Sequence, residues 1–341
     1  MKLSVLDQSP VSAGSSGAEA LRRSLDLGRL TDRLGYTRYW VAEHHGTSML
    51  ACASPEIVIG PIAAATNRMR VGSGGVMLPH YSPLKVAESF STLAALFPER
   101  IDLGLGRAAG SDPVTAFALQ RDRRHPAPDD FPQQLAELLA YLDDQLPAGH
   151  AFARLAALPG RPERPEPWLL GSSVQSGMWA AQAGLPYAFA DFINPHGGAI
   201  ARHYRETFCP SLSPSVSPPG TRPHPRVIVA TWALCAETGA EAERLAASAR
   251  MAFAQFLQGP PGPIPPVEVA LTYLANHPQE VDALAKRRRW SVGTPSTVRA
   301  HLEAVAEEYG ADEVMVVTIT HDHEARRRSY ELIAEAFELL A

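Results

Sequence analysis

Residues Tyr39 to His45 read Tyr-Trp-Val-Ala-Glu-His-His, a short apolar run that leads directly into one carboxylate and two imidazoles. Imidazole is the side chain best suited to moving protons near neutral pH. The C-terminal ends of strands in α/β folds are where such proteins usually carry their chemistry. We therefore expect His44 or His45 to act as a proton donor or base, with Glu43 orienting it. The alternative is a pair of histidines that cap a loop.

Glycines interrupt another apolar run, Val71-Gly72-Ser73-Gly74-Gly75-Val76. Glycine weakens a strand, so its presence there indicates a bulge, an unusual peptide or the close approach of a flat ligand. A bulge that helps a sheet to close is the competing interpretation.

Two further segments have the residue types of a phosphate site. Arg107 follows the run Leu103-Gly104-Leu105-Gly106, and a guanidinium can bind a phosphate through two hydrogen bonds. The turn Gly171-Ser172-Ser173-Val174-Gln175-Ser176 places Ser172, Ser173 and Ser176 at the expected start of a helix, where free N–H groups also attract anions. A surface ion pair and simple helix capping are the alternatives. Because the two segments end successive strands, they can converge on one phosphate.

The segment Thr320-His321-Asp322-His323 near the C-terminus suggests a metal site when it is combined with His44 and His45. We favour a simpler interpretation, in which Thr320 or Asp322 caps the last helix and both histidines are exposed. We therefore expect no metal.

Eight units, each an apolar strand followed by a helical pattern, run from one end of the chain to the other. Apolar strands of this kind belong to a covered parallel sheet, and eight units predict a closed (β/α)₈ barrel, the TIM barrel, as one domain over 1–341. An open doubly wound sheet is the alternative, but Asp7-Gln8-Ser9-Pro10 replaces the glycine-rich turn expected after its first strand. The expected strands are Lys2–Asp7, Tyr39–Ala42, Val71–Met77, Ile101–Gly104, Trp168–Gly171, Tyr187–Ala190, Val227–Leu234 and Asp312–Ile319. The expected helices are 18–34, 55–65, 83–97, 131–145, 173–183, 197–208, 240–256 and 322–340, with an extra helix at 295–309.

Long segments extend this minimal barrel. The insertion between the seventh and eighth strands, 258–290, begins with Gly-Pro-Pro-Gly-Pro-Ile-Pro-Pro and is our candidate lid. The segment Ala109–Asp130 is a second long connection, and Pro210–Pro225 is expected to be a surface connection.

The overall composition excludes several classes of protein. The chain has 341 residues, is 45% hydrophobic and carries a formal net charge of -5, which argues against nucleic acid or an anionic membrane as the main partner. No apolar run reaches the length that spans a membrane, and the first residues do not resemble a signal peptide. The three widely spaced cysteines fit free thiols in a reducing cytoplasm.

Six motifs follow one another along the chain: Glu43-His44-His45, Ser73-Gly74-Gly75, Leu78-Pro79-His80-Tyr81-Ser82-Pro83, Leu103–Arg107, Gly171–Ser176 and Gly310–Val316. In this combination the chain resembles the bacterial luciferase-like, flavin-dependent monooxygenases. The resemblance covers almost the whole chain, and the combination is more specific than any single motif. The chain is similar to the single-component-type oxidoreductases of that family and not to the light-emitting subunits. Gly106 stands where the light-emitting catalytic subunit has a reactive cysteine, which argues against light emission and that subunit's aldehyde chemistry.

The resemblance implies an FMN site at the C-terminal mouth of the barrel. In it, Arg107 and the serines of the 171–176 turn hold the phosphate, and Gly74-Gly75 forms a cis peptide against the isoalloxazine ring. His44 manages protons, while His45 and Ser73 belong to the cofactor site.

The implied reaction uses reduced FMN from a separate flavin reductase, since the sequence has no nicotinamide-binding fingerprint. Reduced FMN and O₂ form a flavin peroxide that oxygenates a small organic substrate. Relatives commonly form homodimers. A relative of the same superfamily that uses the deazaflavin F420 for hydride transfer stays open as an alternative. A metal hydrolase and a non-catalytic flavin-binding protein are further alternatives.

Overall fold

The computed structural model describes residues 1–107, 112–120, 122–125, 129–159, 163–210, 224–259 and 261–339. Within these ranges, eight parallel strands form a closed barrel, in the order β10-β1-β2-β3-β5-β6-β7-β8, and β8 pairs with β10 to close it. The predicted TIM barrel is therefore confirmed. The strands are β1 (Lys2–Asp7), β2 (Arg38–Val41), β3 (Arg70–Ser73), β5 (Ile101–Gly106), β6 (Glu166–Gly171), β7 (Tyr187–Ala190), β8 (Val227–Cys235) and β10 (Glu313–Val317).

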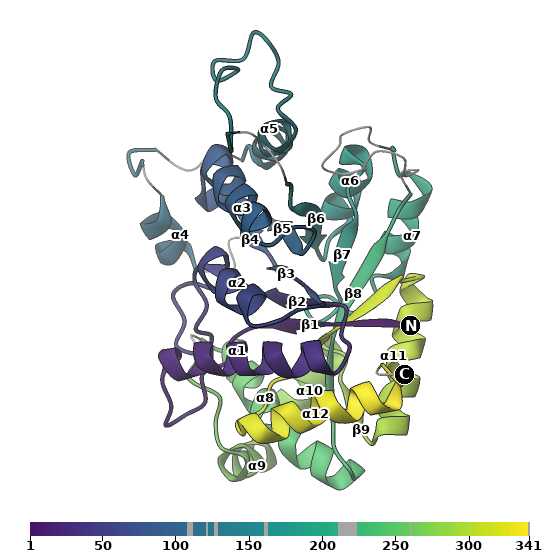
Figure 1. The fold of residues 1–341 in the computed structure, drawn as a ribbon. Coiled ribbons are helices and arrows are strands. Elements are labelled where there is room, and N and C mark those ends of the chain that lie inside the picture. Colours follow the sequence, from purple (N-terminus) through teal and green to yellow (C-terminus); the bar gives the residue numbers. More distant parts are fainter. Residues whose placement is uncertain are drawn as a thin grey trace.

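Helices cover the outside of these strands (Figure 1). Every expected helix is present, with ends that differ from the predicted ends by a few residues. Polar caps fix several of them: Ser16 accepts a hydrogen bond from the backbone of Glu19, and Asp322 accepts one from Ala325. The helices are α1 (Gly17–Arg33), α2 (Pro55–Ala64), α3 (Pro83–Leu96), α5 (Phe131–Asp143), α6 (Val174–Ala183), α7 (Gly198–Glu206), α8 (Gly239–Phe256), α11 (Pro295–Tyr309) and α12 (His323–Ala336). No helix in the described ranges combines the length and the apolar character needed to cross a membrane.

Several elements were not predicted. The segment 258–290 contains α9 (Val267–Asn276) and α10 (Pro278–Arg287) instead of an extended loop, and both helices pack on α8. The short β9 (Ser291–Gly293) pairs with the end of β8, and α4 (Pro113–Leu119) lies in the connection after β5. Parts of that connection, and residues 211–223 of the predicted surface connection, lie outside the described residues.

Successive side chains of a strand point alternately inward and outward, and so contribute to two separate cores: one inside the barrel and one between the barrel and the helices. On β2, Tyr39 points outward and its hydroxyl donates to Asp7 at 2.6 Å, within the core between barrel and helices. Its neighbour Trp40 points into the barrel and meets Trp168 edge to face, with ring centroids 5.6 Å apart. This period of two is what a strand dictates.

Buried charges fill the N-terminal end of the barrel. Arg38, at the first position of β2, contacts Asp102 at 2.8 Å, Glu313 at 3.1 Å and Glu166 at 3.2 Å. Arg70 contacts Asp102 at 2.6 Å. Burial alone would raise the pKa of Glu166, but the neighbouring arginines hold it well below its usual range. We call this group, with Arg226 paired to Glu166, the basal charge network.

We expect Arg38→Met to lower the free energy of unfolding by about 3–5 kcal/mol, because it leaves Asp102 and Glu313 as buried carboxylates without a full set of partners. Urea unfolding followed by circular dichroism would measure this loss. Arg22→Ala, at an exposed position of α1, is the control and should change the free energy of unfolding by less than about 0.5 kcal/mol. A loss under about 1 kcal/mol in Arg38→Met would contradict the role given to the network.

Candidate active site

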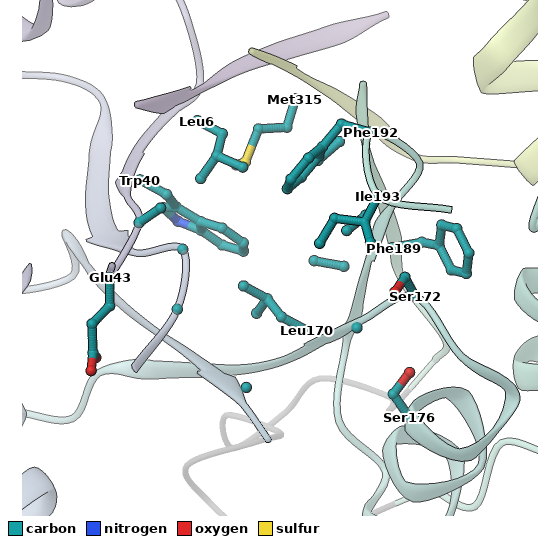
Figure 2. A pocket seen from close by; sticks show the side chains of 18 of the residues that line it. Leu6, Trp40, Glu43, Leu170, Ser172, Ser176, Phe189, Phe192, Ile193 and Met315 are labelled. Carbon is teal, nitrogen blue, oxygen red and sulfur yellow. The ribbon is translucent and has the colours of Figure 1, made fainter. Parts of the chain in front are cut away.

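A cavity of about 590 Å³ opens at the C-terminal ends of the strands, opposite the basal charge network. This volume is within the range of small-molecule and cofactor sites. Side chains from β1, β2, β6 and β10 form its inner part, where Leu6, Trp40, Leu170 and Met315 point toward one space together with Phe192 (Figure 2). The cavity is therefore a mostly apolar pocket at the end of a barrel that is filled below it.

His44 lines this cavity. Its backbone N–H donates to the carbonyl of Cys52 at 2.8 Å, which fixes the turn after β2. Its Nδ1 atom is buried and has no hydrogen-bond partner among the described residues. Burial, with a smaller contribution from His45, lowers the pKa of His44 from 6.5 to about 4. The imidazole is thus neutral at neutral pH.

Glu43 orients the other histidine. Its Oε1 lies 2.7 Å from Nε2 of His45, and its Oε2 accepts from the backbone N–H of Met77 at 3.1 Å. Glu43 lines the cavity and His45 does not. The carboxyl of Glu56 and the hydroxyl of Tyr81 lie in the same group; burial, then the nearby charge of Glu43, raises the pKa of each. Sequence reasoning missed Glu56 and Tyr81, which belong to α2 and to the turn before α3.

The peptide between Gly74 and Gly75 is cis, and both glycines line the cavity. A Cβ atom at Gly74 would lie 2.4 Å from Cδ1 of Leu6, so Leu6 would have to move before any side chain could be accommodated there. Ser73 is buried behind them and donates to the carbonyl of Gly104 at 2.9 Å; it does not line the cavity.

The two expected phosphate-binding segments face the same cavity. Arg107, Ser172, Ser173 and Ser176 all line it. Arg107 is half-exposed at the rim, 2.8 Å from Asp129. Ser173 and Ser176 form a capping box at the start of α6, so helix capping and orientation toward the cavity occur together.

Other cavity residues carried no signal in the sequence. Phe192 and Ile193, in the turn after β7, form one wall (Figure 2). The carbonyl of Phe192 accepts from Arg288 at 2.6 Å, which connects the 258–290 segment to the cavity wall. Gln8, directly after β1, also lines the cavity. Apolar residues and a single amide look the same in a sequence whether they face a core or a ligand.

The two histidines at the start of α12 differ from the expectation that they are exposed. Asp322 caps α12 as predicted, but His321 and His323 are half-buried, not exposed. His323 lies 2.9 Å from Asp26, and His321 contacts the carbonyl of Ala13 at 3.1 Å, because α12 packs against α1 and the loop before it. Within the described residues, no group of three or more His, Cys, Asp or Glu side chains is arranged to hold a metal ion.

A filled parallel barrel with an apolar cavity at the C-terminal strand ends, flanked by a helix start and an arginine, defines a barrel enzyme that binds a small molecule. The family model of luciferase-like monooxygenases matches residues 1–313. The chain therefore belongs to the luciferase-like monooxygenase family and is an oxidoreductase of that family, which confirms the resemblance.

Individual relatives agree with this assignment. The chain is 40% identical to a luciferase-like monooxygenase of Escherichia coli K12, over 99% of this chain and 97% of the relative. It is 33% identical to the N-acetyl-S-alkylcysteine monooxygenase of Bacillus subtilis, over 98% of each chain. The crystal structure of apo-MsnO8 is 45% identical and superposes with a TM-score of 0.88, covering 99% of this chain and 98% of that one.

More distant solved structures share the fold. The oxygenating component of 3,6-diketocamphane monooxygenase, solved with FMN, is 18% identical with a TM-score of 0.69, covering 98% of this chain and 97% of that one. An F420-dependent secondary alcohol dehydrogenase, solved with an F420-acetone adduct, is 13% identical with a TM-score of 0.66, covering 100% and 99%.

The low pKa of His44 predicts a pH-dependent contribution to stability. Since the folded pKa lies below the unfolded value of 6.5, stability is fully present above that pH and is lost as the pH falls toward about 4. We expect a loss of about 1–2 kcal/mol, a discounted value because His44 lines an open cavity. Urea unfolding of the wild type and of His44→Gln across this pH range would measure it. If the free energy of unfolding fell equally with pH in the two proteins, the prediction would be contradicted.

Proposed function

We propose that this protein is an FMN-dependent monooxygenase that takes reduced FMN from a separate flavin reductase and uses O₂ to oxygenate a small organic molecule. One observation carries the proposal: Arg107 and the N-terminus of α6 face a single cavity, and the two glycines Gly74 and Gly75 border the same cavity. These are a charged end and a flat, side-chain-free wall, as a phosphorylated planar cofactor requires.

The residues present fit such a cofactor. Of the first amides of α6, that of Ser176 is paired with the side chain of Ser173, and helix geometry leaves those of Val174 and Gln175 without a partner in the helix. Ser172 and Ser173, beside these amides, line the cavity. Among the described residues, a Cβ atom added at Gly106 would meet the backbone of Val76 alone, at 3.9 Å, so these residues leave space beside this position. Arg107, Ser172, Ser173 and Ser176 would hold the phosphate, and Gly74 and Gly75 would border the ring system. His45 and Ser73 would support this wall from behind it.

When bound, reduced FMN would supply the electrons that activate O₂. The apolar wall made by Leu6, Phe192 and Met315 would exclude water from that space. His44 would hold or accept a proton beside it, since a nearby negative charge favours the imidazolium and moves its pKa upward. Glu43 keeps His45 in place and leaves His44 as the imidazole on the cavity.

The segment 258–290 is our proposed lid. Its first part contacts the loops after β1 and β2: the N–H of Ile264 donates to the carbonyl of Val11 at 2.7 Å, and Ser48 donates to the carbonyl of Pro261 at 3.1 Å. Arg288 at its far end holds the carbonyl of Phe192. Movement of this segment would therefore be transmitted to the cavity wall.

We further propose a homodimer in the cytoplasm. Ile57 on α2 and Leu96 on α3 are 68% and 67% exposed, and pairing of this face would cover them. The three cysteines are free, as in a reducing compartment. A single boundary at the mass of one chain in sedimentation velocity would contradict the dimer.

F420-dependent hydride transfer is the second candidate. It is favoured by the shared fold of the F420-dependent secondary alcohol dehydrogenase, and Arg107 with the start of α6 could bind the phosphate of either cofactor. The two candidates differ in whether the reduced cofactor reacts with O₂.

Arg107→Ala tests the phosphate site. We expect it to weaken the binding of FMN by about 1.5–3 kcal/mol, which is typical of a charge-assisted contact, in anaerobic titrations followed by flavin absorbance. Arg22→Ala is the control and should leave the affinity unchanged. Unchanged affinity in Arg107→Ala would remove Arg107 from the site.

His44→Gln, in the same titrations, separates proton handling from binding. It should still bind reduced FMN but should alter the rate at which oxidised flavin forms after O₂ is added. Wild-type kinetics in this variant would show that His44 has no proton role.

A further inference from the structure

Gln8 carries an unsatisfied hydrogen-bonding group at the wall of the cavity. It follows β1 directly, lines the cavity and is only 5% exposed. Its Oε1 atom is buried and has no hydrogen-bond partner within the described part of the chain. Buried amide oxygens are normally paired. A turn of the side-chain amide would bring this oxygen to a ligand in the cavity, which can therefore supply the partner.

Apolar side chains from neighbouring strands line the same cavity as Gln8. Leu6, Trp40 and Met315 come from neighbouring strands and point into the inner cavity (Figure 2). Among the described lining residues, Glu43 and Arg107 carry formal charge at neutral pH, and each already has a partner. Glu43 is bound to His45, and Arg107 contacts Asp129 at the rim.

This environment discriminates between ligands by charge. A carboxylate or ammonium group in the inner cavity would lose its hydration without meeting a counter-charge, which is strongly unfavourable. A neutral group with an N–H or O–H donor would lose less, because Oε1 of Gln8 could accept its hydrogen bond.

We propose that Gln8 is a specificity-determining residue that selects an uncharged, mostly apolar organic substrate with one hydrogen-bond donor. The apolar part of the substrate lies against Leu6, Trp40 and Met315, and its donor binds Oε1 of Gln8. This inference rests on the proposed function and names the substrate class of the same cavity.

Two matched pairs of ligands test the inference. N-benzylacetamide and benzyl acetate have nearly the same shape, but only the amide has an N–H donor. The amide 3-phenylpropanamide and the acid 3-phenylpropanoate differ in charge. Isothermal titration calorimetry would compare their affinities for the flavin-free and the FMN-loaded protein. The variants are Gln8→Met, which keeps side-chain length, and Gln182→Met on the exposed face of α6 as the matched control.

In the wild type and in Gln182→Met, N-benzylacetamide should bind about tenfold more tightly than benzyl acetate. Gln8→Met should lose this preference while keeping its FMN affinity within about twofold, because the phosphate-binding residues belong to other strands. The carboxylate should bind at least about tenfold more weakly than the carboxamide in the wild type.

Equal binding of amide and ester by the wild type would overturn the role of Gln8, and this comparison needs no variant to fold. A preference that persists in folded Gln8→Met would do the same, and equal binding of carboxylate and carboxamide would overturn the uncharged substrate class. Failure of the proposed function is separable: a wild type that binds no FMN yet keeps the amide preference when flavin-free would contradict the FMN assignment alone.

Discussion

In the basal charge network, Arg38 of β2 joins β5, β6 and β10 at the N-terminal end of the barrel. Arg38, Asp102 and Glu313 stand at or near the first positions of three strands and meet inside the closed barrel. Buried charges are costly unless each finds its partners, so the network requires the β2, β5 and β10 strands to keep their register. The aromatic pair Trp40 and Trp168 fills the layer above it, and Trp40 donates to Asp102 at 2.8 Å. The barrel is therefore filled from its N-terminal end upward, and the opposite end is left open as a cavity.

The two sides of the cavity at the open end carry different chemical groups. On one side, the turn after β2 separates the two histidines, since Glu43 binds His45 and leaves His44 on the cavity with a depressed pKa. On the other side, Arg107 supplies a positive charge, and the N-terminus of α6 supplies the positive end of its helix dipole. An apolar wall lies between them, so a ligand that spans the cavity would meet charge at one end and a neutral imidazole at the other.

The fold and the polar half of the site were predictable, because each rests on a local pattern. Apolar strands that alternate with helical periods gave the barrel, and His44, Arg107 and Ser173 are reactive or anion-binding types at strand ends. The remainder depends on contacts between distant positions. Arg38 and Glu313 are 275 residues apart, and no sequence pattern predicts that they pair. Phe192 is indistinguishable from a core residue in the sequence. The prolines before α9 and α10 predict an extended loop, whereas the structure has two helices there.

We propose that the cavity holds a reduced flavin that reacts with O₂. Anaerobic titration with reduced FMN and with reduced F420, followed by rapid mixing with oxygenated buffer under absorbance detection, would test this. We expect preferential binding of reduced FMN and a transient absorbance change before oxidised flavin appears. Preferential binding of F420 with no reaction with oxygen would contradict it and would move the protein to the hydride-transfer branch of the superfamily.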